Sequence, residues 1–451
     1  MTSLVLWLLL FQSESPPGEP PADRAGAPIA AESVEIKGAD LSLLTSVREI
    51  AQRVEQQREQ KFRSPPIAVR TPDHMREVAA TIRALNVLER ERLEARGRAW
   101  EDLGLGQPSS PERLYLLLAG DLAGIGFDPQ GNRLLVAPEV LTDKDFSPQG
   151  PDDESSATLL MMTGVRVDEP LASHLLMHVR QRERRGADSL AETTDELLAS
   201  SAWAEGEANL VAIRYLFAGM GLADAVLDPA LSPADLLDGA LVPPALANGG
   251  LGDSERALVR FVYDEGFFAA KTAFGAGGWE ALDRAMAART TTRDLIHPGR
   301  EAAAPVRVVV ERPPQADGLE RVDTDTLGQQ AIVTLVSTVT GKDNLGLQAG
   351  DGWVGDSVVR WEDPQHEPRD GVTVWCTRLR DAQAAADFDY AVSRTLQARF
   401  PGRPPIEIDG DRVIQTADRV VRLRRVGVDV TLQVSARRFD ELPAGGSRAE
   451  R

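Results

Sequence analysis

The sequence has one cysteine, Cys376, among its 451 residues. No disulfide can form within the chain, and a zinc site made of cysteine thiolates is excluded. The residues around it, GVTVWCTRL, alternate as in a β-strand. We expect Cys376 to be a small buried side chain rather than a functional thiol.

Basic residues are scarce relative to acidic ones. The chain has 50 lysines and arginines against 69 aspartates and glutamates, which gives a formal net charge of −19. An acidic protein repels the phosphates of nucleic acids and of anionic lipid surfaces. We therefore expect no nucleic-acid partner, and an unidentified protein or peptide is the expected partner instead.

Long hydrophobic runs are also missing, because no stretch approaches the roughly 18 apolar residues that suggest a membrane-spanning helix. The apolar run at residues 4–11 suits the core of a secretory signal peptide. We expect residues 1–12 to be such a signal and the protein to be exported, to the periplasm or outside the cell. No lysine or arginine precedes the run, so a structureless N-terminus is the alternative. Residues 13–38, rich in Pro, Gly and Ala, are expected to be a disordered linker.

Motifs for nucleotide binding and for serine hydrolases are absent. The chain has no P-loop, no Gly-x-Gly-x-x-Gly after a strand and no Gly-x-Ser-x-Gly. The glycine-rich stretch GAGGW, at 275–279, falls between two predicted helices. A turn explains it better than a phosphate-binding loop.

What the sequence does contain predicts an α+β protein. Residues 39–345 are expected to form a mostly helical domain with a short β-hairpin around residues 127–137, and APVRVVVERPP is expected to be a strand near its end. After Gly350 the apolar residues alternate with period two, except in one helical stretch, which predicts a small α+β domain at 350–435 and a disordered tail at 436–451. Helices are predicted by apolar spacing at 41–61, 73–96, 169–184, 189–219, 251–274, 278–288 and 381–400.

Two of the five histidines, His174 and His178, are four residues apart in LASHLLMHVRQ. On a helix this spacing puts both imidazoles on one face, where both can reach one zinc ion at about 2.0–2.1 Å. A third ligand is needed, and Glu205 in AEGEANL lies on a later predicted helix that can return to the pair. The alternative is a core helix with two hydrogen-bonded histidines and an exposed glutamate.

The order of several motifs resembles exported bacterial HExxH metallopeptidase-like proteins, a poorly characterised group of gluzincin type. The resemblance covers roughly residues 40–435. It rests on LLLAGDLAGIGFDPQGNRLLVAPEVL, LASHLLMHVRQ, AEGEANLVAIRYL, the helices that close on DLIHP, DTLGQQ and GWVGDSVVRWE. The resemblance implies a zincin-like helical domain, with His174, His178 and Glu205 as the metal ligands. Its catalytic glutamate falls on Leu175, which can neither accept nor donate a proton.

Three interpretations follow. The first is an inactive metallopeptidase homologue that acts as an exported binding or scaffolding protein, with or without a bound zinc ion. The second is an active zinc peptidase with another general base, and the third is a structural protein with no metal. Glu207 should point away from the ligands, because it lies two residues after Glu205 on the same helix. Glu207 and His297 are expected in the second shell at most, whereas His74 and His366 look like ordinary surface residues.

Overall fold

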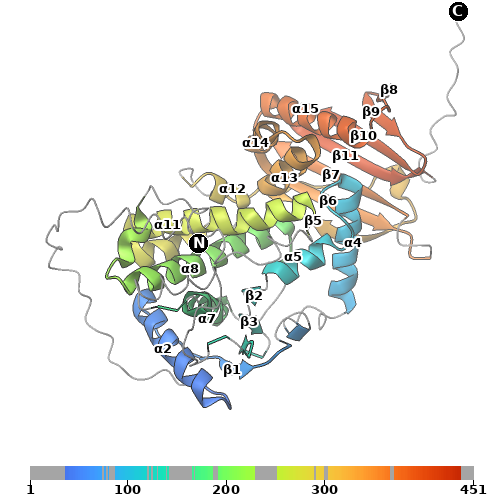
Figure 1. Cartoon of the computed structure of the whole chain (residues 1–451). Helices are drawn as coiled ribbons and strands as arrows, with labels where there is room; N and C mark the ends of the chain where they lie inside the picture. The colour runs from blue at the N-terminus through green and yellow to red at the C-terminus, as the bar shows by residue number, and fades with distance from the viewer. Residues whose placement is uncertain are drawn as a thin grey trace, which may run out of the picture.

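The protein is an α+β chain in which helices and a large sheet occupy different regions (Figure 1). The helical region covers residues 36–298 and the sheet region covers residues 303–437. Among the described residues, no helix combines the length and apolarity needed to cross a bilayer. The computed structural model describes residues 36–73, 76–77, 80, 87–118, 121–122, 125–128, 131–138, 140–141, 165–166, 168–185, 191–228, 251–288, 291–298, 303–365 and 370–437. The expected signal peptide and most of the expected linker and tail lie outside these residues.

The helical region is built from helices whose apolar faces share one core. In α2 the buried residues recur at helical spacing, and the side chain of Asp40 caps the helix by accepting from the Leu43 N–H. Thr193 caps α8 in the same way. The elements of this region are α2 (Leu41–Arg58), α4 (Val87–Leu103), α5 (Ser110–Leu118), α7 (Asp168–Arg185), α8 (Thr194–Ala218), η1 (Ala223–Leu227), α11 (Asp253–Ala288) and α12 (Thr292–Ile296).

The prediction for the histidine pair is confirmed: both histidines lie on α7, which packs against α8 with Glu205 facing them. Two other predicted helices, at 251–274 and 278–288, are joined as α11. The join is not regular helix, because Gly277 and Gly278 have non-helical dihedral angles. The glycine-rich stretch therefore kinks the chain between two helical segments. This agrees with the turn that the sequence predicts there.

A small sheet lies beside α7. Its strands are β1 (Ile67–Arg70), β2 (Asp121–Leu122), β3 (Ile125–Asp128) and β4 (Arg133–Val136), in the order β1-β4-β3-β2. Strands β3 and β4 form the predicted hairpin, and Asn132 adopts a positive φ of 48° in its turn. Strand β1 pairs parallel to β4.

The sheet region holds a seven-stranded antiparallel sheet with helices on one face (Figure 1). On that face Trp375 makes an edge contact with Phe388 of α15, at 5.5 Å between ring centroids. The strands, in the order β5-β6-β7-β11-β10-β9-β8, are β5 (Glu320–Asp325), β6 (Trp353–Glu362), β7 (Gly371–Leu379), β8 (Ile406–Ile408), β9 (Asp411–Gln415), β10 (Arg419–Val426) and β11 (Asp429–Ala436). Besides α15 (Ala382–Arg399), the region contains η2 (Pro314–Ala316), α13 (Gly328–Thr340) and α14 (Asp343–Asp351).

Two features differ from the sequence-based expectation. The valine-rich stretch APVRVVVERPP is extended but forms no strand; Val306 donates one backbone hydrogen bond to Val354, at 2.8 Å. Strand β5 falls within the range assigned to the helical domain, yet it pairs with β6 of the sheet. Its sequence, ERVDTD, lacks the apolar alternation that marks a strand, so the strand is recognised only by its pairing with β6.

Ion pairs join α4 to the sheet. Arg96 contacts Asp323 of β5 at 3.1 Å, and Asp102 accepts from Arg360 of β6 at 2.6 Å. Arg98 donates to Glu362 of the same strand, at 2.6 Å. These pairs, which we call the α4–sheet ion pairs, hold the helical and sheet regions together.

Candidate metal centre

Three ligand-type atoms converge between α7 and α8. Nε2 of His174 lies 3.0 Å from Nε2 of His178 and 3.1 Å from Oε2 of Glu205. Nε2 of His178 lies 3.4 Å from Oε1 of the same carboxylate. These three residues form a buried group that can hold a metal ion.

The distances between these atoms are near those around a tetrahedral ion. Two atoms bonded at about 2.0–2.1 Å to a tetrahedral zinc lie about 3.3 Å from each other. The two imidazole nitrogens lie 3.0 Å apart, and each lies 3.1 or 3.4 Å from a different oxygen of the Glu205 carboxylate. An ion bonded through a single carboxylate oxygen therefore requires that oxygen to face both imidazoles.

A glutamine sets the orientation of His178. Nδ1 of His178 lies 2.9 Å from Oε1 of Gln181, one turn further along α7. Because an amide oxygen only accepts, the proton of the neutral ring sits on Nδ1 and Nε2 is left bare for a ligand bond. The Gln181 amide in turn donates to the Ala204 carbonyl at 2.7 Å, and to Glu207 at 3.1 Å.

Glu207 faces away from the three ligands, as expected. Its carboxylate accepts from Arg58 of α2, at 2.8 Å, and from Arg184 of α7. Burial by itself raises the pKa of Glu207, but the two guanidinium groups outweigh it and the net shift is downward. Glu207 therefore acts on the centre only through Gln181.

Helix α11 closes the other side of the centre. A Cβ on Gly206 would lie 2.0 Å from the Gly266 carbonyl oxygen, so only glycine allows α8 and α11 to approach this closely. The approach brings the buried Tyr263 phenol of α11 to Glu205. Burial raises the pKa of Glu205, but the histidines and Tyr263 lower it more, so the net shift favours the carboxylate.

Buried polar atoms around the centre lack hydrogen-bond partners among the described residues. Nδ1 of His174 is one of them. Asn209, one helical turn after Glu205, has both side-chain polar atoms unsatisfied. Unsatisfied buried polar atoms cost free energy, so this cluster fits a ligand that supplies the missing interactions.

The centre has no proton acceptor where an HExxH peptidase has its glutamate. Leu175 occupies that position and is fully buried. The site is also closed: the exposed fraction is 14% for the His178 side chain and 1% for those of His174 and Glu205. A metal held here would polarise a bound water, but the Leu175 side chain cannot accept the proton of that water.

The other predicted residues lie elsewhere or outside the described residues. His297, at the end of α12, contacts Gln329 at 3.1 Å and Asp351 at 3.6 Å, both in the sheet region. It is not one of the three residues of the cluster. His74 and His366 lie outside the described residues.

Sequence reasoning missed part of this site. Gln181 follows His178 by three residues, so its place on the same helical face was available from the sequence. Tyr263 and Arg58 come from helices distant in sequence, and no local pattern indicates that they meet α8.

Comparison with known proteins bears mainly on the sheet region. Residues 314–444 match a family described as a domain of unknown function (DUF8575). The match includes none of the three ligand residues. No curated protein and no solved structure matches the chain. The metal centre is therefore supported by its geometry and by the sequence motifs.

Proposed function

We propose that this protein is a catalytically inactive relative of the HExxH metallopeptidases that retains a zinc centre and acts by binding or scaffolding. The observation that carries the proposal is the trio of His174, His178 and Glu205, whose imidazole nitrogens and carboxylate converge in one buried group that can hold a metal ion. Two imidazoles and one carboxylate are a donor set that zinc accepts. The likeness of the surrounding motifs to that group supports the same assignment.

The inactive state rests on Leu175 and on the burial of the ligands. Loss of a general base typically costs about 10²–10⁴-fold in rate. A peptide also has to reach the metal, and the ligand side chains are almost wholly covered. Zinc in this centre therefore stabilises the contact between α7 and α8 rather than activating water.

Metal analysis tests the zinc assignment. Purified protein saturated with zinc and then desalted should contain about one zinc per chain, and His174→Ala should contain none. His297→Ala is the matched control, because it removes a histidine outside the cluster, and it should keep its zinc. A wild-type protein that stays metal-free after zinc excess would contradict the proposal.

A peptidase assay tests inactivity. The native chain should not cleave an unfolded protein substrate, whereas Leu175→Glu restores the missing proton acceptor. Cleavage by Leu175→Glu alone would show that only the base was lost. Cleavage by the native chain that a chelator stops and His178→Ala abolishes would overturn the proposal.

We also propose that the protein is exported, on the basis of the apolar run at residues 4–11 and the polar, proline-rich sequence that follows it. Expression of the full chain in a bacterium, followed by fractionation and N-terminal sequencing, tests this. A cytoplasmic protein that retains residues 1–12 would contradict it.

A further inference from the structure

The seven-stranded sheet has a second face, away from α13 and α15. The segment 303–316, which we call the strap, runs over part of this face. Val310 and Ala316 of the strap pack on a small apolar cluster separate from the main core. Its other members are Leu319, Val359, Trp361, Val372 and Val374. The strap is thus anchored over β6 and β7, and none of the described members of this cluster comes from β11, β10 or β9.

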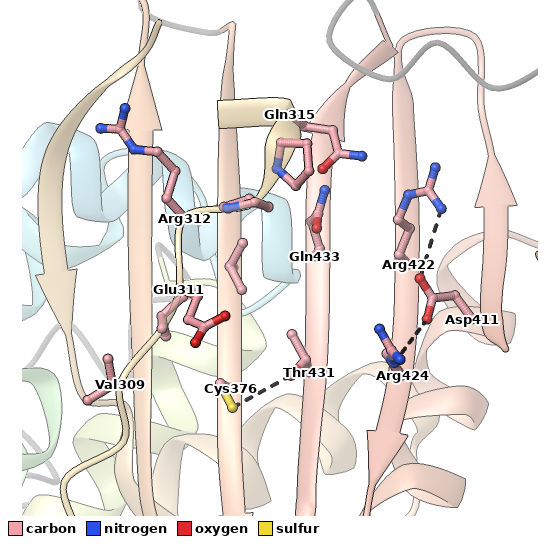
Figure 2. Close-up of a pocket in the computed structure, with 14 residues that line it drawn as sticks. Val309, Glu311, Arg312, Gln315, Cys376, Asp411, Arg422, Arg424, Thr431 and Gln433 are labelled. Atoms are coloured by element: carbon pink, nitrogen blue, oxygen red, sulfur yellow. Dashed lines mark hydrogen bonds and ion pairs between the residues drawn. The ribbon is translucent and has the colours of Figure 1, made fainter. Parts of the chain in front are cut away.

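Beside the strap lies a groove of about 470 Å³ (Figure 2). One wall is the strap and the floor is formed by strands β7, β11, β10 and β9. Its lining residues are 309–315 of the strap with Val374, Cys376, Asp411, Arg422, Arg424, Thr431 and Gln433. Most of the strand residues that line it are polar, which is unlike the apolar cluster next to it.

Strand register places the floor residues in rows. Cys376 lies directly opposite Thr431, and Thr431 lies directly opposite Arg424. Directly opposed residues point to the same face of a sheet. Since neighbouring strands are about 4.8 Å apart, this row spans roughly 10 Å from β7 to β10.

The two ends of the row differ in charge. At the β10 end, Arg422 and Arg424 share one carboxylate, that of Asp411, at 3.9 and 3.6 Å. The Arg424 side chain is 60% exposed, so its guanidinium remains open to a second anion. At the β7 end, Figure 2 shows the carboxylate of Glu311 over the strand that bears Cys376. Among the described residues, no ion pair to Glu311 is formed.

The floor between the two ends offers an acceptor and a donor. The Thr431 hydroxyl donates to Sγ of Cys376, which leaves its oxygen as an acceptor, and Nε2 of Gln433 is buried with no hydrogen-bond partner among the described residues. The strap forms no strand at 307–312, so its backbone N–H and C=O groups there do not belong to a strand ladder. The groove therefore combines a negative end, a positive end and polar groups between them.

We propose that this groove binds a short peptide of two or three residues with both termini free. The amino group binds Glu311, the carboxylate binds Arg422 and Arg424, and the peptide groups bind Gln433 and the strap. An extended chain spans about 3.3–3.6 Å per residue, so two or three residues match the row of roughly 10 Å. Glu311 repels a simple anion and the arginines repel a simple cation, whereas a zwitterion pairs with the opposite charge at both ends.

Cys376 provides the measurement, because it is the one thiol of the chain and lines the groove. Burial raises the pKa of this thiol, so a thiol-reactive dye should label the full-length protein slowly at pH 8. Trialanine should slow the labelling further, in a saturable manner and by at least tenfold at saturation. Acetylating its N-terminus or amidating its C-terminus should each weaken the protection at least tenfold.

Substitutions separate the two ends. Glu311→Gln should weaken trialanine at least fivefold but leave N-acetyl-trialanine unchanged, because that peptide has no charged amino group to lose. Arg424→Gln should weaken trialanine but not trialanine amide. Arg394→Gln is the matched control, because this exposed arginine lies on α15, on the other face of the sheet. It should leave protection by trialanine unchanged.

Several outcomes overturn the proposal. They are the absence of saturable protection at millimolar trialanine, equal protection by the peptide blocked at both ends, and binding of free alanine as tight as that of trialanine. Rapid labelling of every variant in guanidinium chloride confirms that the thiol is intact. Unchanged circular dichroism of the folded variants ensures that lost protection is not lost structure.

Discussion

The polar side chains of the metal centre, in the helical region, are buried, whereas those of the groove, in the sheet region, lie at the surface. In the helical region, two imidazoles and a carboxylate are buried between helices, and the side chain of the neighbouring Asn209 has no partner among the described residues. In the sheet region, the polar groove lies at the surface, where 60% of the Arg424 side chain is exposed. Burial of the metal centre costs desolvation free energy, which a bound metal ion can offset, whereas water already solvates much of the groove.

The comparison teaches where a ligand should matter for folding. A ligand that binds only the folded state stabilises it by mass action. The increase in the free energy of unfolding is largest where the ligand gives partners to buried polar groups that otherwise have none. We therefore expect metal to contribute to the stability of the helical region. We expect a ligand in the groove to have little effect on the stability of the sheet region.

The largest effect is expected at Glu207, the buried carboxylate between Arg58 and Arg184. Glu207→Gln should lower the free energy of unfolding of the metal-free protein by about 3–5 kcal/mol, because it leaves buried guanidinium charge unpaired. Urea denaturation with a chelator present measures it. Glu280→Gln, which removes an exposed pair with Arg284, should cost under about 1 kcal/mol. Equal losses in the two variants would remove the contrast between buried and exposed charge.

The next effect is a pH dependence at Asp195, near the junction of the two regions. Burial raises the pKa of Asp195 to about 7. The folded state then holds a proton that the unfolded state releases near pH 4, so the free energy of unfolding should fall as pH rises from about 4 to about 7. The slope from this group is at most about 1.4 kcal/mol per pH unit.

Asp195→Asn should remove this fall and raise stability at pH 8, since an amide oxygen can still accept from the Thr292 N–H and hydroxyl. Denaturation midpoints at pH 5 and pH 8 measure the difference. Asp381→Asn is the comparison, because that carboxylate is exposed and its pKa is lowered by the backbone N–H of Ala384. A wild-type protein whose stability loss above pH 5 persists in Asp195→Asn would disprove the assignment.

A smaller effect is expected on zinc affinity from Gln181. Gln181→Met removes the acceptor for the Nδ1 proton of His178 while keeping the side-chain length. Zinc affinity should fall about 10–100-fold, as is usual when a partner of a metal-bound histidine is lost. Competition with a chromophoric chelator measures it. Gln383→Met, on the exposed face of α15, should leave the affinity unchanged.

The smallest effect is expected in the groove. Arg424→Gln should change the free energy of unfolding by less than about 0.5 kcal/mol, because its pair with Asp411 is long and solvent-exposed. Thermal or urea denaturation of the metal-free protein checks this value. A loss above about 2 kcal/mol would mean that the groove is a structural feature rather than a surface open to a ligand.

The sequence predicted the metal centre better than its surroundings. The four-residue spacing of His174 and His178 is a local property of a helix, and apolar periodicity placed both α7 and α8. The contacts of Tyr263 and Arg58 depend on how distant helices pack, which no local spacing encodes. The valines at 306 and 308–310 have high strand propensity, but propensity alone does not supply a neighbouring strand.

The α4–sheet ion pairs bear on whether the sheet can exist as a separate unit. The family match begins at residue 314, after α4, so it describes a segment without that helix. A fragment 314–444 would keep Arg360 and Asp323 but lose Asp102 and Arg96, which compensate them. Excision would expose this charged surface and leave Arg360 with fewer partners. In this chain, the segment that matches the family thus relies on a helix outside its borders to compensate part of its charge.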